Sequence, residues 1–276
     1  MKAILFLCSF FIFSNLPAQN YKYYFNSAKV LYKAGNFESA IKYFDTAISK
    51  NSKRVNAFYN RGLCYAELNE HFRAENDFSY FIVKYPNDAS AYHERALSRS
   101  EINDTLGALE DFNKSIQLDP KKRNFRLERS MFLAETLEDR TASIQDLDAM
   151  IHQDSTDAFA YFMKGYNLYF LEQYDSAFTN FNSAYKHDST NEFTSYYLGK
   201  YYNINQEYSK AIVCFSNAIQ INAEDYRFFE GRGLAYLYND DDEDDYLACE
   251  DFQTAVKLGS KAAQKFIDDY CEEDEG

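Results

Sequence analysis

Apolar and small residues recur along this chain with a fixed period. Residues 161–184 contain two amphipathic helical segments separated by a short polar break, with Gly165 and Ala177 as their small residues. The small residue of the first segment recurs at Ala28, Gly62, Ala96, Ser130, Gly165, Gly199 and Gly233. The steps between these positions are 34, 34, 34, 35, 34 and 34 residues. A fixed period in this range predicts an array of structural repeats.

Two further columns of residues keep step with the first. The small residue of each second segment falls at Ala40, Ala74, Ala108, Ser143, Ala177, Ala211 and Ala248. A large apolar residue follows four positions later, at Phe44, Phe78, Phe112, Leu147, Phe181, Phe215 and Phe252. Small residues let two helix backbones approach closely, and the large side chain one turn later fills the space beside the crossing. The pattern predicts two helices per repeat, each of about 12–14 residues or roughly 20 Å.

The breaks and capping residues between these segments divide the chain into seven units. We expect them at 21–54, 55–88, 89–122, 123–157, 158–191, 192–225 and 226–260. Pro86 and Pro120 close the second and third units, where a helix must stop. A capping helix at 261–271 and an acidic tail at 272–276 are expected to follow.

Residues 21–260 resemble the tetratricopeptide repeat family. In the second unit its pattern appears as Phe58, Gly62, Tyr65, Ala74, Phe78 and Pro86. The resemblance implies an all-α, right-handed solenoid that has no catalytic activity, with its first helices lining a concave groove. The fourth unit departs most from the pattern, with Ser130, Ser143, Leu147 and one inserted residue, so we expect a local kink there.

Composition narrows the range of partners. Only nine Gly and three Pro suit a helical chain. The net charge of −14 argues against nucleic acid and against an anionic membrane surface, since no basic stripe offsets it. A peptide or protein that carries basic and apolar residues is the partner that this charge favours.

Residues 1–18 have the layout of a secretory signal peptide. Lys2 precedes an apolar run from Ala3 to Phe13, and a short region of small and polar residues leads to Ala18. We expect cleavage after Ala18 and export to the periplasm or beyond. The alternative is an uncleaved anchor, but the apolar run is too short to span a bilayer. No later segment is apolar enough to span a membrane.

Export makes disulfide bonds possible. Cys249 and Cys271 lie equally far from the turn at Ser260, so an antiparallel helix hairpin would bring them level with each other. We expect either a Cys249–Cys271 bond or two free buried thiols. Cys64 and Cys214 lie in different repeats and are expected to be buried small hydrophobic residues.

The sequence contains no constellation typical of an enzyme, a metal site or a cofactor site. The four histidines lie in four different repeats, and no phosphate-binding glycine loop is present. Asp240, Asp242 and Asp244 alternate as in a calcium loop, but Asp245 stands where that loop needs glycine, so we expect a solvated acidic loop.

A binding surface is the remaining candidate site. Helical rotation from the packed glycines, together with the family resemblance, places a set of mostly aromatic residues in the groove: Tyr59, His93, Phe162, Tyr166, Tyr169, Phe170, Phe193, Tyr196, Lys200 and Arg227. Aromatic side chains commonly anchor protein interfaces. The alternative is that these residues pack against the adjacent repeat. The expected function is a scaffold for a peptide or partner protein, with glycan binding in a tyrosine-rich groove as the alternative. The carboxylate clamp of some family members is not expected, because Ser90 and Glu94 replace its cations.

Overall fold

The computed structural model describes residues 20–239 and 244–271. The expected signal peptide with its cleavage bond, the acidic tail, and Asp240 and Asp242 of the acidic loop lie outside the described residues.

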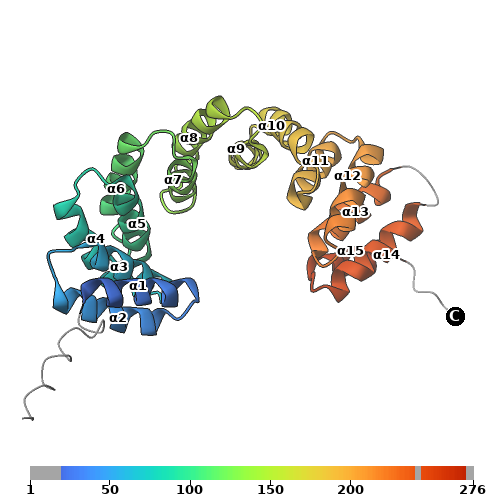
Figure 1. The fold of residues 1–276 in the computed structure, drawn as a ribbon. Helices are drawn as coiled ribbons and strands as arrows, with labels where there is room; N and C mark the ends of the chain where they lie inside the picture. The colour runs from blue at the N-terminus through green and yellow to red at the C-terminus, as the bar shows by residue number, and fades with distance from the viewer. Residues whose placement is uncertain (1–19, 240–243, 272–276) are drawn as a thin grey trace, which may run out of the picture. The chain divides into compact units, whose positions relative to one another are not determined.

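Within the described residues the fold consists of fifteen α-helices and contains no strand, which confirms the all-α prediction (Figure 1). The helices of the first half are α1 (Tyr21–Lys33), α2 (Phe37–Lys50), α3 (Asn56–Glu67), α4 (His71–Lys84), α5 (Ala89–Glu101), α6 (Thr105–Leu118) and α7 (Arg123–Glu135). Those of the second half are α8 (Arg140–Gln153), α9 (Ala158–Phe170), α10 (Tyr174–His187), α11 (Glu192–Ile204), α12 (Tyr208–Ile221), α13 (Tyr226–Leu237), α14 (Asp244–Lys257) and α15 (Ala262–Tyr270).

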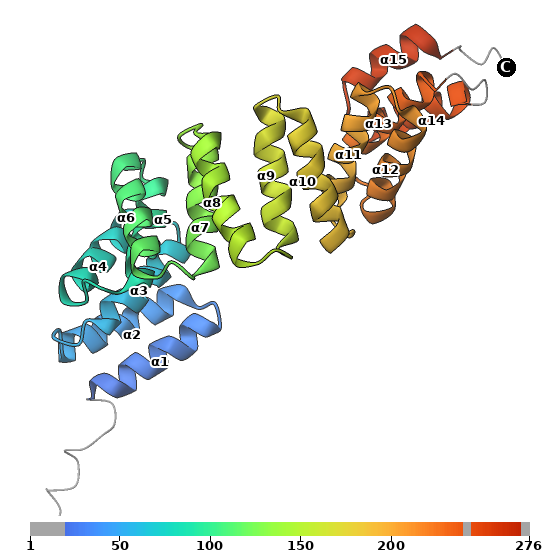
Figure 2. The same ribbon diagram turned by 90° about the horizontal axis from the view of Figure 1, so that it is seen from above.

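Consecutive helices pack as antiparallel pairs (Figure 2). The pairs include α1 with α2, α3 with α4 and α5 with α6, and further along α9 with α10, α11 with α12 and α13 with α14. A second helix also packs on the first helix of the next pair, as α2 does on α3 and α10 on α11. The last helix, α15, packs on α14. Within each unit, helix pairs that are in contact therefore bury one another's apolar faces, as in a repeat array.

The chain divides into two units within α7. Unit 1 is Met1–Arg129, and unit 2 is Ser130–Gly276. The division falls in the fourth predicted repeat, whose sequence departs most from the others. The kink expected in that repeat stays a prediction.

The close approach of paired helices explains the columns of small and large residues. The side chains of Phe44, Phe78, Phe112, Phe181, Phe215 and Phe252 are at most 1% exposed. A Cβ added at Gly62, Gly165, Gly199 or Gly233 would lie 2.8–2.9 Å from the phenylalanine ring of its own pair. Contacts this short do not occur between real Cβ atoms and neighbouring carbons, so a side chain at these four positions would force the ring to shift. Ala28 and Ala96 occupy the same column beside Phe44 and Phe112, so the repeat accepts either of the two smallest residues there.

The turn inside each of the first six pairs places one residue in the left-handed region of the backbone. These residues are Gly35, Asn69, Asn103, Glu138, Glu172 and Gln206, with φ between 54° and 75°. They are spaced by 34, 34, 35, 34 and 34 residues, so the extra residue of the fourth repeat precedes its turn. Only glycine adopts this conformation without cost, and asparagine tolerates it better than most residues.

Side chains at the helix starts cap the backbone. Asp88, Asp104, Asp139 and Asp157 each accept a hydrogen bond from the backbone N–H three residues ahead. Caps of this kind satisfy one of the free N–H groups at a helix N-terminus and typically contribute about 1 kcal/mol.

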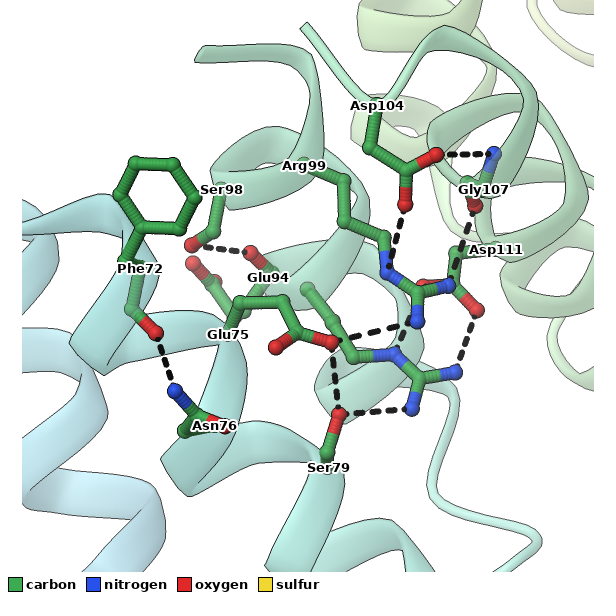
Figure 3. Close-up of polar contacts among 11 residues, drawn as sticks. Phe72, Glu75, Asn76, Ser79, Glu94, Ser98, Arg99, Asp104, Gly107 and Asp111 are labelled. Atoms are coloured by element: carbon green, nitrogen blue, oxygen red, sulfur yellow. Dashed lines mark hydrogen bonds and ion pairs between the residues drawn. The ribbon is translucent and has the colours of Figure 1, made fainter. Parts of the chain in front are cut away.

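Arginine–carboxylate pairs tie the helices of unit 1 together (Figure 3). Arg95 on α5 binds Asp111 on α6 through two hydrogen bonds of 2.7 Å, and also donates to Ser79 Oγ on α4 at 3.0 Å. Arg99 donates to Asp111 at 2.9 Å and to Glu75 on α4 at 3.2 Å. Bidentate pairs fix geometry as well as charge. The network therefore sets the register of three consecutive helices.

Replacing Gly35 tests the turn conformation. A Cβ at this position would meet nothing within 4 Å, so any effect comes from the backbone alone. We expect Gly35→Ala to lower the free energy of unfolding by about 1–2 kcal/mol. Gly35→Asn should cost clearly less, since asparagine occupies the matching position at Asn69 and Asn103. Urea unfolding measures both variants, and equal losses for Ala and Asn would contradict this explanation.

The last helix hairpin brings two cysteines together. The Sγ atoms of Cys249 and Cys271 lie 2.06 Å apart, with 5.8 Å between the Cα atoms. Cys64 is buried and Cys214 is partly buried, and neither is bonded to another cysteine.

Thiol titration of the denatured, unreduced chain beginning at Gln19 tests the disulfide bond. We expect two reactive thiols, from Cys64 and Cys214, and four after reduction. Four thiols before reduction, in protein purified from an oxidising compartment, would show that the bond does not form.

Candidate functional site

The first helices of unit 2 gather aromatic side chains around Tyr197. The Tyr197 ring on α11 stacks on Phe181 with centroids 5.1 Å apart, and this places it against the core. Its centroid lies 5.6 Å from Tyr166, 5.1 Å from Tyr169 and 5.1 Å from Tyr196. Phe170 contacts both Tyr166 and Tyr169. We call Tyr166, Tyr169, Phe170, Tyr196 and Tyr197 the tyrosine cluster.

The tyrosine cluster is open to solvent in part. Phe170 is 48% exposed, and Tyr166, Tyr169 and Tyr196 are half-buried. Two more of the expected residues extend it: Phe162 contacts Tyr166 and Tyr197, and Phe193 contacts Tyr196's neighbour Phe228. The packing of these residues against the adjacent repeat is observed, and their placement in a binding groove stays a prediction. These rings pack between adjacent repeats and still present part of their surface to solvent.

Three cations lie against these rings. Lys200 Nζ is 4.8 Å from the Tyr169 centroid and 5.6 Å from that of Tyr196. The Arg140 guanidinium lies 4.7 Å from the Phe170 centroid, and that of Arg227 lies 5.2 Å from Phe193. Cation–π contacts of this kind hold a charge in place while leaving its other donors available.

The surroundings of Lys200, Tyr196 and Tyr197 raise the pKa of each of these side chains. Burial lowers the pKa of the Lys200 ammonium, but the hydroxyl of Tyr169 and the tyrosines around it outweigh burial, so the pKa rises above its ordinary value. Burial also raises the pKa of Tyr196 and of Tyr197. At neutral pH the site thus offers the ammonium of Lys200 and the neutral hydroxyl groups of Tyr196 and Tyr197, which can donate hydrogen bonds.

Tyr59 and His93, the other two expected groove residues, lie in unit 1. Tyr59 on α3 is half-buried, with its ring centroid 5.6 Å from Phe78 and 4.9 Å from Phe81. His93 on α5 is only 8% exposed and packs 4.7 Å from Phe125. We expected His93 to face an open groove, but the structure uses it as a packing residue, because the ring of Phe125 on α7 covers it.

Sequence reasoning missed two residues of the site. Tyr197 occupies a column that is polar in the first four repeats, with Asn60 and Glu94 among its members. The change to a large aromatic residue in this column was the available signal. Arg140 begins α8 and reaches Phe170 and Asn167 of the next helix pair, with its Nη1 donating to Asn167 Oδ1 at 3.0 Å. No sequence pattern indicated that contact.

An ion pair that links the two helices in other repeats is replaced by two uncharged residues beside the tyrosine cluster. Arg61 pairs with Asp77 and Arg95 with Asp111, sixteen residues apart in each case. At the matching positions of α11 and α12 stand Leu198 and Cys214, which belong to one apolar cluster. Burial raises the pKa of the Cys214 thiol to about 11, so it stays uncharged. A neutral pair therefore takes the place of a charged one.

A double-mutant cycle tests this exchange. Leu198 is 4% exposed, so Leu198→Arg buries a cation without a carboxylate and should lower the free energy of unfolding by about 3 kcal/mol. Adding Cys214→Asp should recover at least about 1 kcal/mol of that loss, measured by urea unfolding. Additive losses would show that the two positions are not a pair.

The side chains of the candidate site are of the kinds that bind ligands through noncovalent contacts. In the part of the chain that the structure covers, no three His, Cys, Asp or Glu side chains are grouped to hold a metal ion. Among the same residues, no helix has the length and apolar character needed to cross a membrane. The tyrosine cluster itself provides rings, hydroxyls and an ammonium, which suit noncovalent recognition.

Comparison with known proteins agrees with this picture. Residues 25–89 match a model of the tetratricopeptide repeat family. No curated protein matches the chain. Among solved structures, the C-terminal part of a TPR repeat-containing protein from Cytophaga hutchinsonii is 15% identical with a TM-score of 0.74, covering 90% of this chain and 100% of that one.

Two further structures show the same fold. A tetratricopeptide repeat protein from Parabacteroides merdae is 15% identical with a TM-score of 0.64, covering 91% of this chain and 98% of that one. YrrB, described as a TPR protein with an unusual peptide-binding site, is 17% identical with a TM-score of 0.57, covering 70% and 97%. Residues 25–89 therefore match the tetratricopeptide repeat family, and the described chain has the fold of these solved repeat proteins.

Proposed function

We propose that this protein is a binding scaffold without catalytic activity, and that unit 2 holds a peptide segment or partner protein on the face formed by α9, α11 and α13. The observation that carries the proposal is the tyrosine cluster, whose rings are held by the core on one side and open to solvent on the other. In the solenoid that the family resemblance implies, this face is the concave groove.

Preorganisation supports this function. Tyr197 stacks on the buried Phe181 ring, and Tyr169 contacts Tyr197 and Tyr174. Rings fixed in this way lose little conformational freedom when a ligand binds, so more of the contact energy appears as affinity. Tyrosine anchors also supply a large apolar area together with a hydroxyl.

Export is a second part of the proposal. The layout of residues 1–18 supports a cleaved signal peptide, and the pairing of Cys249 with Cys271 is consistent with this, because disulfide bonds persist outside the cytosol. We therefore place the partner outside the cytoplasm, in the periplasm or beyond.

Glycan binding is the alternative, favoured by one observation. The half-exposed Phe170 ring lies beside tyrosine hydroxyls, and a sugar needs both an aromatic face and hydrogen-bonding groups. The net charge of the whole chain favours a basic partner. The charged groups that lie beside the tyrosine cluster are a closer guide to the charge of the partner than the net charge is.

Removing the two central rings of α9 tests the function. The chain beginning at Gln19 is screened against a displayed library of random dodecapeptides and against an oligosaccharide array. We expect peptide capture, and we expect Tyr166→Ala combined with Tyr169→Ala to weaken it about tenfold or more. Capture of oligosaccharides alone, or peptide capture unchanged in the double variant, would contradict the proposed site.

Two controls separate binding from folding. Tyr166→Phe combined with Tyr169→Phe keeps the rings and should keep the fold, which circular dichroism and thermal unfolding verify. Tyr246→Ala combined with Tyr270→Ala removes two tyrosines that are 68% and 53% exposed outside the cluster. This matched pair should leave peptide capture unchanged.

A further inference from the structure

We propose that the segment bound at the tyrosine cluster is acidic, with a carboxylate that pairs with Lys200 and apolar side chains that pack on the neighbouring rings. This inference rests on the proposed function, since it names the chemistry of the ligand at that site.

The ammonium of Lys200 has no anionic partner among the described residues. Other partly buried cations of the chain bind carboxylates: Arg61 binds Asp45 and Asp77, Arg95 binds Asp111, and Arg232 binds Asp251. Lys200 is likewise half-buried, but within the described chain only tyrosine rings and hydroxyls surround it. A cation held in this way by neutral groups is free to pair with an incoming anion.

Arg140 shows the same feature beside Phe170. Its guanidinium packs on the Phe170 ring and donates to the Asn167 amide oxygen, and no carboxylate of the described residues lies within ion-pair distance of it. Arg227 also packs on Phe193, but it is already bonded to Asp225. The aromatic surface is therefore bordered by two cations, Lys200 and Arg140, whose charge the described residues do not neutralise.

The other cations of the first helices in this unit are already paired. Lys164, Arg227 and Arg232 each lie in an ion pair with a carboxylate. Among the cations of α9, α11 and α13, Lys200 is therefore the one without a carboxylate partner in the described part of the chain. An unpaired cation favours an anionic group of the ligand at this position, although the whole chain carries a net charge of −14.

A basic ligand would meet rings that already hold a cation. The faces of Tyr169, Tyr196 and Tyr197 that could hold a cation are already approached by Lys200, at 4.8, 5.6 and 5.9 Å. A second cation would have to displace Lys200 or lie beside a like charge, which is unfavourable in a half-buried site. The hydroxyl groups of Tyr196 and Tyr197 can donate hydrogen bonds to a carboxylate instead.

The experiment combines library selection with removal of the charge. A displayed library of random dodecapeptides is selected on the full chain from Gln19, on Lys200→Met and on Lys210→Met. Methionine keeps an unbranched apolar stem on the rings. Lys210 is the matched control, because it is an exposed lysine of α12 in the same unit and is already bonded to Glu207.

We expect the unaltered chain and Lys210→Met to enrich peptides that combine Asp or Glu with aromatic or aliphatic residues. A synthetic peptide from that pool should bind Lys200→Met about tenfold more weakly, Lys200→Arg nearly as well as the unaltered chain, and the unaltered chain more weakly as salt rises.

Two results would overturn the inference, and they differ in what else they affect. Selection of neutral or basic peptides that still require Tyr166 and Tyr169 would contradict the acidic ligand and leave the proposed function standing. Equal selection by the unaltered chain and by Tyr166→Ala combined with Tyr169→Ala, or no selection at all, would contradict both.

Discussion

The close crossing of two helices over a buried phenylalanine is the contact on which the rest of this structure depends. A repeat of about 34 residues cannot bury its own apolar face, so each pair is stable only when the next pair covers it. Gly165 and Gly199 let their helices approach the rings of Phe181 and Phe215 so closely that an added Cβ would lie 2.8–2.9 Å from the ring. The crossing also fixes the rotation of each first helix. Every side chain on α9 and α11 then has a set direction, and Tyr169 and Tyr197 meet as a result.

The candidate site lies where one repeat lacks the ion pair that links the two helices in other repeats. In unit 1 the first helices are tied to their partners by charged pairs such as Arg95 with Asp111. In unit 2 the matching positions at Leu198 and Cys214 are apolar, and tyrosines cover the surface beside them. The charge that remains, on Lys200, is balanced by rings and hydroxyls and not by an acid of the described chain. The repeat fold thus supplies a stack of packed helices and, on it, a surface whose cation has no carboxylate partner among the described residues.

The columns of small and large residues were sufficient to predict the helices, because each column has a direct steric cause. The turns were also readable, since Asn69 and Asn103 stand where a left-handed residue is needed. The contents of the site were predictable only in part. Rotation from Gly165 located Tyr166 and Tyr169, but it assigned His93 to an open surface although the ring packs on Phe125. Whether a residue of the groove column is buried depends on the size of its neighbours in the next repeat. A contact such as Arg140 with Phe170 joins two repeats through side-chain reach, and periodicity carries no information about it.

Hydrogen exchange with and without a bound peptide tests the central claim most directly, namely that α9, α11 and α13 form a preformed binding face. With a peptide selected on the unaltered chain, the account predicts slower amide exchange in these three first helices, centred on the turns of α9 and α11 that carry Tyr169 and Lys200. It also predicts little change in α10 and α12, and unchanged helix content by circular dichroism. Protection centred on α10 and α12, or a gain of helix on binding, would contradict the account.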